Sequence, residues 1–410
     1  MAAFRFCFIG ALFCCIFSCQ KSVSPNNPAP TGTDSFTVTV TNGYGSGKYK
    51  TGDTVHIWSK ELGSEQLFDA WTGADVASLN TNDWHAWFIM PSRNTAFTAN
   101  LKTTPVFTLN YEQIRGRDRL KPVYSYFPAN QKGIVYMLHG TGGTATNLVN
   151  SFEGRYILNE LVGNGFAVVV TEAEEATTQV DANGDGKLRW VTNSFDTTAN
   201  VDLANIRIIT DTFYKRGSAI RSNPQYSLGM SDGGLFSAVL SYPYKFKAAI
   251  SYCAQSGNAL ASTSTIPMQY CMQRFDDAPE VGAAGNATAL ANSQTLSGRG
   301  ICSKYFINEH SPLYPERFAR RTDISIATSN AIFNEIKSRG YLNGGNFFNA
   351  SSDAYKAAVL ASPASFPVFL SLNAQQEIFV LDELDCSAAE HQLYSDFTKL
   401  SLKFLNTQCQ

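Results

Sequence analysis

The chain has little net charge, few histidines and no cysteine pair spaced for zinc. Its 32 lysine and arginine residues against 34 aspartate and glutamate residues give a formal charge of −2, so no basic field is present to hold nucleic acid. The apolar run at residues 6–17 is too short to cross a membrane as a helix. No cysteine beyond residue 19 has the close pairing of a structural zinc site. With only five histidines, chemistry that needs an imidazole has few candidates.

The first 19 residues have the layout of an export signal. Arg5 precedes the apolar run, and Ser18 and Cys19 end it, as in a bacterial secretion signal. The ending resembles a lipobox, whose cysteine is lipidated after cleavage. We therefore expect residues 1–19 to be a lipoprotein-type signal peptide with Cys19 as the lipidated residue. The exported protein would then be held at the outer membrane or cell surface by a lipid anchor alone. A plain signal peptide, which would give a secreted protein, is the alternative.

The cysteines that would remain after export all lie in the second half of the chain. They are Cys253, Cys271, Cys302, Cys386 and Cys409. An oxidising compartment permits disulfides, and an odd number leaves one cysteine unpaired. The spacing leaves the connectivity open.

Two short regions precede the main body of the chain. Residues 20–35 are rich in Pro, Ser, Asn and Thr, which predicts a flexible linker. Residues 36–41 alternate apolar side chains with threonine, which predicts a half-buried strand. The runs NGYGSGKYKTGDTVHIW, FDAWTG and FIMPSRNTAFTANLK resemble the small β-repeat domains of the internalin B-repeat type. This resemblance implies that residues 36–103 form a β module that acts as a spacer or adhesive unit and not as a catalyst.

Four of the five tryptophans lie in this predicted module. They are Trp58, Trp71, Trp84 and Trp87. They could form an aromatic platform for a sugar or polymer. A domain of under seventy residues, however, needs large side chains to build any core, so we expect them to be core residues.

Residues 104–410 alternate strand-like and helix-like runs. Strands are expected at 106–111, 122–127, 133–139, 166–171, 248–253, 267–275 and 366–372, and helices at 147–162, 199–214, 234–241, 328–338 and 392–405. This alternation predicts an α/β fold, with a mostly parallel sheet covered by helices on both faces.

The motif Gly229-Met230-Ser231-Asp232-Gly233 carries the strongest chemical signal. A G-x-S-x-G turn between a strand and a helix holds a serine hydroxyl exposed beside a base, which a weak nucleophile requires. A short strand precedes the motif and a helix-like run follows it. Ser231 is therefore the expected nucleophile.

A second segment would complete such a site. The apolar strand at 135–138 leads into His139-Gly140-Thr141-Gly142-Gly143, a glycine-rich turn that can aim a backbone N–H at a developing oxyanion. We expect the backbone N–H groups of Thr141 and Asp232 to form the oxyanion hole. An ordinary glycine-rich turn is the alternative.

Together these motifs and the segment YPYKFKAA at 242–249 resemble the α/β-hydrolase superfamily, in particular secreted esterases of the feruloyl-esterase and polyhydroxyalkanoate-depolymerase kind. The resemblance implies ester hydrolysis by a triad in the chain order serine, acid, histidine. Asp276 then matches the acid, and His391, ahead of the last helix, matches the base. His310 is the rival base. The rival acids are Asp277, Asp382 and Asp385.

Three further expectations concern the surroundings of the site. Residues from about 280 to 362 exceed what a minimal hydrolase needs and predict an inserted helical cap, or a helical decoration away from the site. Trp190 and Met230 are candidates for substrate binding, Trp190 equally as a core or lid residue. Asp181, Asn183 and Asp185 resemble the opening of a calcium loop, but Thr192 stands where an EF-hand needs glutamate. No metal or other cofactor is expected to take part in the chemistry.

The sequence thus predicts an exported serine esterase that acts on carboxylic esters, including carbohydrate-linked and polymeric ones, without a cofactor. A serine peptidase on the same fold is the alternative, because the triad does not distinguish an ester from an amide. A surface binding protein with a degenerate hydrolase domain is a third hypothesis, which the presence of Ser231, Asp276 and His391 disfavours.

Overall fold

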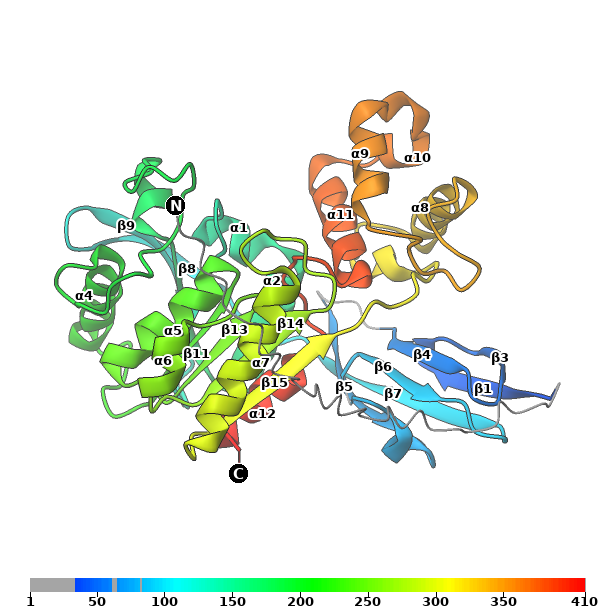
Figure 1. Cartoon of the computed structure of the whole chain (residues 1–410), viewed down its shortest axis with the longest axis horizontal. Coiled ribbons are helices and arrows are strands. Elements are labelled where there is room, and N and C mark those ends of the chain that lie inside the picture. The colour runs from blue at the N-terminus through cyan, green and yellow to red at the C-terminus, as the bar shows by residue number, and fades with distance from the viewer. Residues whose placement is uncertain (1–33, 61–64, 82, 410) are drawn as a thin grey trace, which may run out of the picture.

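The computed structural model describes residues 34–60, 65–81 and 83–409 (Figure 1). The predicted signal peptide with Cys19, and the predicted linker up to residue 33, lie outside the described residues. Among the helices that the structure describes, none is both long and apolar enough to cross a membrane.

An eight-stranded sheet forms the centre of the larger domain. Its strands are β8 (Asn110–Arg115), β9 (Leu120–Tyr126), β10 (Ile134–Leu138), β11 (Ala167–Thr171), β12 (Gln225–Met230), β13 (Ala248–Tyr252), β14 (Met268–Gln273) and β15 (Ser303–Asn308). Their order is β15-β14-β13-β12-β10-β11-β9-β8. Strands β10 to β15 run parallel, whereas β9 is antiparallel to β11 and β8 is antiparallel to β9. The carboxyl ends of the six parallel strands therefore share one edge of the sheet.

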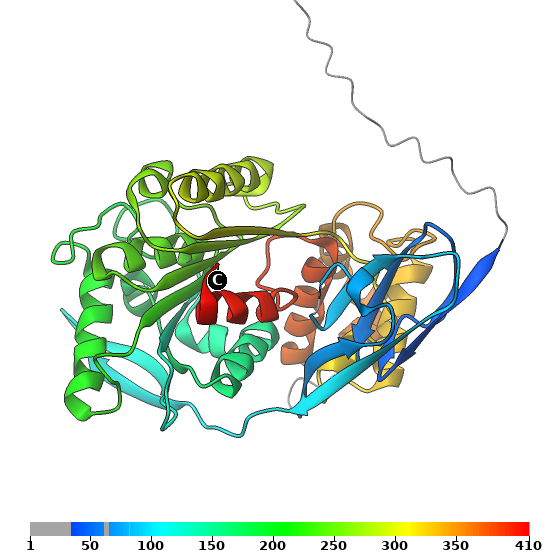
Figure 2. The same cartoon turned by 90° about the horizontal axis from the view of Figure 1, so that it is seen from below.

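Helices cover both faces of this sheet, because successive side chains of its inner strands are apolar on each side. In β10, for example, Val135 and Met137 enter one core while Ile134 and Tyr136 enter the other. The first face is covered by α1 (Ala145–Asn150), α2 (Phe152–Gly163) and α12 (Thr398–Thr407), and the second by α3 (Glu174–Thr178), α4 (Val201–Arg216) and α5 (Asp232–Tyr244). Two further helices, α6 (Asn258–Thr263) and α7 (Gly282–Gly298), cover β13 and β14 (Figure 2). The predicted α/β-hydrolase architecture is confirmed.

The helical insertion is present, but its bounds differ from those expected. Residues 282–308 belong to the main domain, because α7 covers the main sheet and β15 pairs with β14 as its edge strand. The inserted unit follows them and has its own apolar core. It contains η2 (Arg317–Arg320), α8 (Ile326–Ser338), α9 (Asp353–Ala361), η3 (Pro363–Ser365), α10 (Pro367–Leu370) and α11 (Ala374–Ala388). We refer to residues 309–388 as the helical unit.

Several element boundaries also differ from the sequence-based ones. The strand expected at 366–372 is wrong, because that segment is mostly helix α10, whose Phe369 enters the core of the helical unit. The single helix expected at 147–162 is two helices, with Ser151 as the N-cap of the second. The strand expected at 106–111 begins instead at Asn110.

The β module consists of two small sheets around a shared aromatic core. One sheet has the order β3-β1-β7-β5 and the other β2-β4-β6. The strands are β1 (Ser35–Thr41), β2 (Gly43–Tyr44), β3 (Gly47–Lys50), β4 (Thr54–Ser59), β5 (Gln66–Thr72), β6 (His85–Ile89) and β7 (Thr95–Thr103), with a short η1 (Val76–Ser78) between β5 and β6. Trp58, Trp71 and Trp84 are buried in the core, whereas Trp87 is half-buried.

The module packs closely against the rest of the chain. The guanidinium of Arg320 lies 3.7 Å from the ring centre of Trp84, and that of Arg317 lies 5.0 Å away. His85 Nδ1 lies 2.9 Å from Asp396 Oδ1. A cation over a desolvated tryptophan is a favourable contact. The module is therefore packed against the rest of the chain and is not separated from it.

One disulfide occurs among the described cysteines. Cys302, just before β15, is bonded to Cys409, just after α12. Cys253, Cys271 and Cys386 are buried free thiols. The disulfide ties the C-terminal helix to the edge of the main sheet.

Because Trp84 is shared between the module and the helical unit, its loss should destabilise the whole chain. We expect Trp84→Ala to lower the free energy of unfolding by ~3–5 kcal/mol, seen in calorimetry as a lower melting temperature of one common transition. Trp87→Ala, at a half-buried position, is the control and should cost less. A separate low-temperature transition that alone responds to Trp84→Ala would contradict the shared core.

Candidate active site

Ser231 lies on a sharp turn between β12 and α5. Its φ of 57° is in the left-handed region, which is strained for a residue with a side chain. The turn is tight: a Cβ on Gly229 would lie 2.0 Å from the carbonyl oxygen of Gly233, and one on Gly233 would lie 2.3 Å from that of His139. The N–H of Ser231 donates to the carbonyl oxygen of Tyr252 at 2.8 Å. Only glycines at 229 and 233 permit this backbone path.

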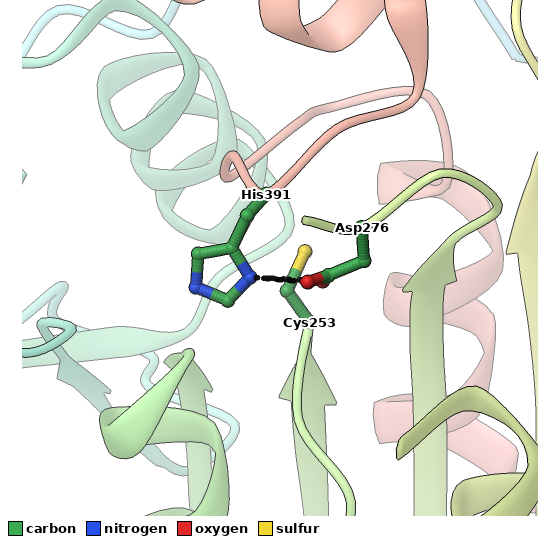
Figure 3. A group of neighbouring side chains, drawn as sticks. All are labelled: Cys253, Asp276 and His391. Atoms are coloured by element: carbon green, nitrogen blue, oxygen red, sulfur yellow. Dashed lines mark hydrogen bonds and ion pairs between the residues drawn. The ribbon is translucent and has the colours of Figure 1, made fainter. Parts of the chain in front are cut away.

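The structure brings Ser231, His391 and Asp276 together. His391 Nε2 lies 2.9 Å from Ser231 Oγ. On the other side of the ring, His391 Nδ1 lies 2.9 and 2.8 Å from the two carboxylate oxygens of Asp276, a contact that Figure 3 shows. A carboxylate can only accept, so Nδ1 carries the proton, and the lone pair on Nε2 can accept the serine hydroxyl proton. The Asp276 side chain is fully buried, whereas that of His391 is 18% exposed.

Backbone contacts hold the acid and the base in register. Asp276 follows β14, and the N–H of Ala278 donates to its Oδ1 at 3.1 Å. The N–H of Phe275 donates to the carbonyl oxygen of Ala389 at 2.8 Å. The N–H of His391 donates to Asp277 Oδ1 at 3.3 Å. The rival acid Asp277 therefore supports the backbone of the histidine instead of its ring.

The other rival residues lie elsewhere. His310 is exposed and contacts the rings of Phe275 and Phe347. Asp382 accepts a hydrogen bond from the side chain of Gln392 at 2.8 Å. Asp385 lies within 2.7 Å of the ammonium of Lys356. None of these three contacts Ser231 among the described hydrogen bonds.

The turn after β10 lies beside the nucleophile. A Cβ on Gly140 would lie 3.1 Å from the Cβ of Ser231. His139 fixes the turn, with Nδ1 2.6 Å from the carbonyl oxygen of Gly140 and Nε2 accepting the N–H of Ala173 at 3.1 Å. Burial lowers the pKa of His139 to about 4, so its ring is neutral near neutral pH.

The two expected oxyanion donors are free to act. Asp232 is the first residue of α5, a position whose N–H has no acceptor within the helix. Thr141 borders the cavity beside Ser231, and its N–H has no acceptor among the described residues. The neighbouring N–H of Gly142 already donates to the carbonyl oxygen of Leu188 at 2.8 Å.

A cavity of about 360 Å³ adjoins Ser231. Its wall contains both apolar and polar side chains. The polar ones include those of Glu175, Asn183, Arg189, Asn193, Gln255 and Glu280. Lys187 and Glu280 form an ion pair between the loop before Trp190 and the loop after β14. The helical unit contributes no described residue to this wall, so it does not shape the cavity directly.

Of the two expected substrate-binding residues, neither presents a free side chain to this cavity. Trp190 is in the wall but only 2% exposed, because its ring stacks on Phe236 at 4.6 Å and its Nε1–H donates to the carbonyl oxygen of His139 at 2.9 Å. Met230 is half-buried and packs against the strand core. Trp190 therefore supports the turn at residues 139–143 through its hydrogen bond to His139.

The calcium-like loop is closed by its own hydrogen bonds. The carboxylate of Asp181 accepts the N–H groups of Gly184 and Gly186 at 2.7 and 2.6 Å. Asn183 Oδ1 accepts the N–H of Asp185, and the carboxylate of Asp185 pairs with Arg189. These contacts account for the residue pattern without an ion, and calcium binding stays a prediction.

Cys253 was not identified from the sequence as part of this region. Its thiol lies beside the carboxylate of Asp276 and the ring of His391 (Figure 3). Burial, together with the charge of Asp276, raises the pKa of this thiol well above its usual value, so it stays protonated and is a poor metal ligand. It donates a hydrogen bond to the carbonyl oxygen of Gln392, and thus steadies the chain next to His391.

Comparison with known proteins gives a likeness of fold only. No protein-family model matches the chain, and no curated protein matches it. A carboxyl esterase from Bacillus coagulans is 10% identical, covering 49% of this chain and 90% of its own, with a TM-score of 0.37. An acetyl xylan esterase from Aspergillus awamori is 17% identical, covering 47% and 81%, with a TM-score of 0.35. A dienelactone hydrolase from Anabaena variabilis is 14% identical, covering 50% and 87%, with a TM-score of 0.37.

The steric requirement at the serine turn can be tested with two glycines. Gly229→Ala should abolish labelling of the protein by a fluorophosphonate, because its Cβ would collide with the carbonyl of Gly233. Gly257→Ala is the matched control, since a Cβ there meets no atom within 4 Å, and it should label normally. Equal labelling of the two variants would show that the turn is not constrained in this way.

Asp232 should also give the protein a pH-dependent stability. Its carboxylate accepts the N–H of Trp190 at 2.7 Å, and burial raises its pKa to about 6. In the unfolded chain this carboxyl group ionises near pH 4, whereas in the folded protein it ionises near pH 6. The folded state is therefore favoured while the group is protonated, and the free energy of unfolding falls as the pH rises from about 4 to 6. We expect Asp232→Asn to be more stable relative to wild type at pH 7.5 than at pH 4.5, measured by urea unfolding. A difference that does not change with pH would contradict this. Asp202 is a second buried aspartate whose pKa is raised to about 6. The stability of Asp202→Asn relative to wild type, measured at the same two pH values, is compared with that of Asp232→Asn.

Proposed function

We propose that this protein is a serine hydrolase that cleaves carboxylic esters through an acyl-enzyme. The observation that carries the proposal is the continuous chain Ser231–His391–Asp276, with heavy-atom separations of 2.8–2.9 Å. It ends at a serine held on a strained turn beside a cavity. This geometry activates a hydroxyl that is otherwise a weak nucleophile.

The proposed reaction has two halves. Ser231 Oγ attacks the ester carbonyl as His391 Nε2 takes its proton, and Asp276 stabilises the imidazolium that forms. The N–H groups of Thr141 and Asp232 stabilise the oxyanion. His391 then returns the proton to the leaving alcohol. In the second half His391 takes a proton from a water, which attacks the acyl carbonyl. The bond to Ser231 Oγ breaks, His391 returns the proton to Oγ, and the acid leaves.

The polar side chains in the cavity wall favour an oxygen-rich ester, and we propose carbohydrate-linked or polymeric esters as the substrate class. A carboxylate or amide in the wall can hydrogen-bond hydroxyl groups, which a purely apolar acyl pocket cannot do. We also propose that the protein is exported and held by a lipid on Cys19. Peptide hydrolysis remains the second candidate activity, because the same groups could attack an amide.

Alanine substitutions test the triad. With p-nitrophenyl acetate as substrate, Ser231→Ala and His391→Ala should each lower kcat by roughly 10⁶, since the two residues act as one unit. Asp276→Ala should cost less, roughly 10⁴, because the acid only orients and stabilises the imidazolium. Folding of each variant is checked by its melting temperature.

His310→Ala and Asp277→Asn are the controls for the two rival assignments. His310→Ala should keep nearly full activity, and Asp277→Asn should lose far less than Asp276→Ala. The triad assignment would be wrong if His310→Ala were inactive while His391→Ala kept most activity. A parallel assay on peptide amides distinguishes an esterase from a peptidase.

A further inference from the structure

Two adjoining cavities lie between the β module and the rest of the chain, apart from the site at Ser231. One, of about 450 Å³, lies between the module and β15 together with the segment before α12. The other, of about 520 Å³, lies between the module and the start of the helical unit. Both have His56 in their walls, and neither shares a lining residue with the cavity beside Ser231. We call the pair the module groove. Each cavity is in the size range of small-molecule sites.

The charge of the module groove disfavours an anionic ligand. Among the described residues, no lysine or arginine lines either cavity. Three carboxylates do, those of Glu309 and Asp396 in the first cavity and that of Glu316 in the second. Glu309 is paired with Arg274 and Asp396 with His85, so no cation of the described lining is left to bind a phosphate or an acidic polymer.

Aromatic rings supply flat apolar surface along the groove. Trp87, the one half-buried tryptophan of the module, and the half-buried Tyr305 both line the first cavity. In the second cavity Tyr44 is half-buried, and its ring lies 5.5 Å from that of Tyr314. Tyr314 and Trp58 are buried and stack on one another at 4.3 Å, so they support the wall behind Tyr44. Rings of this kind offer an apolar face with a polar edge, which suits a ligand that carries both C–H faces and hydroxyl groups.

His56 lies in the wall shared by the two cavities and belongs to a buried chain of polar contacts. Asp396 Oδ1 accepts a hydrogen bond from His85 Nδ1 at 2.9 Å, and His85 Nε2 lies 3.0 Å from His56 Nδ1. His56 Nε2 takes no part in these contacts, so it can exchange a hydrogen bond with a ligand hydroxyl. Burial and the neighbouring His85 and His310 lower the pKa of His56 to about 2, so the ring stays neutral. Thr81, in the wall of the first cavity, has a buried hydroxyl with no partner among the described residues, and buried polar groups normally have one.

We propose that the module groove binds a neutral oligosaccharide. Pyranose rings would lie against Trp87, Tyr305 and Tyr44, and sugar hydroxyls would form hydrogen bonds with His56 Nε2 and with the lining carboxylates. This inference is independent of the proposed hydrolytic function, because the groove contains none of the triad residues. It assigns the module a binding role in place of a spacer role.

Affinity electrophoresis of the full chain tests the proposal. The Ser231→Ala protein is run in gels containing xylan, mixed-linkage β-glucan or galactomannan, with polygalacturonate as the acidic comparison. We expect retardation by at least one neutral polysaccharide and none by polygalacturonate. Calorimetric titration with the matching oligosaccharide then gives Kd for each variant in the same background.

Trp87→Ala should raise Kd by at least about ten-fold, and His56→Phe should weaken binding while it keeps an aromatic ring. Tyr111→Ala removes a 52% exposed ring on β8, outside the groove, and should leave Kd unchanged. Melting temperatures establish that the variants are folded. The proposal is overturned if no neutral polysaccharide retards the protein, if only the acidic polymer does, or if Trp87→Ala binds as well as its parent.

The two proposals fail in separable ways. With Ser231 intact, Trp87→Ala should hydrolyse p-nitrophenyl acetate at the wild-type rate, because this small ester needs only the cavity beside Ser231. Loss of glycan binding with unchanged ester hydrolysis supports the groove as a separate site. Equal loss of both would show that Trp87 acts on the catalytic domain and not on a glycan.

Discussion

The close approach of the turn after β12 to the end of β10 is the constraint on which the site depends. At Gly233 a Cβ would reach 2.3 Å from the carbonyl oxygen of His139, so the two strand ends touch backbone to backbone. Thr141, Ser231 and Asp232 all border the cavity beside this contact. The strain at Ser231 is sustained because the parallel sheet on both sides holds the two strand ends in place.

The histidine depends on a different part of the chain. Helix α11 ends at Ala388, Ala389 reverses the chain with a φ of 56°, and His391 follows. Ser352, in the helical unit, binds the carboxylate of Glu390 through both its N–H and its hydroxyl. The helical unit therefore supports the chain next to His391, although none of its described residues lies in the cavity wall.

A buried ionic cluster joins the helical unit to the β module. Arg317 and Arg320 share the carboxylate of Glu383, and Arg320 also pairs with Glu153 of α2. Burial raises the pKa of Glu153 to about 8, whereas the two arginines hold the pKa of Glu383 below its usual value despite burial. Trp84 covers this cluster from the module side. Buried charges are costly unless they are paired. The packing of the helical unit, α2 and the β module around this cluster is therefore expected to form cooperatively.

The turn at Ser231, the glycine-rich turn after β10 and the alternation that gives a parallel sheet could be predicted from the sequence, because each depends on residues close in the chain. Glycines at 229 and 233 are a local steric requirement, so their spacing could be recognised without the fold. Strand β15 could not be predicted from the sequence pattern, because this edge strand is only partly buried and has no continuous apolar run. Only the tertiary structure distinguished Asp276 from its neighbour Asp277, because that depends on which side chain faces His391 across 115 positions of sequence. It also decided that His85 meets Asp396, 311 positions away. No local pattern encodes such pairs, since packing of distant elements creates them.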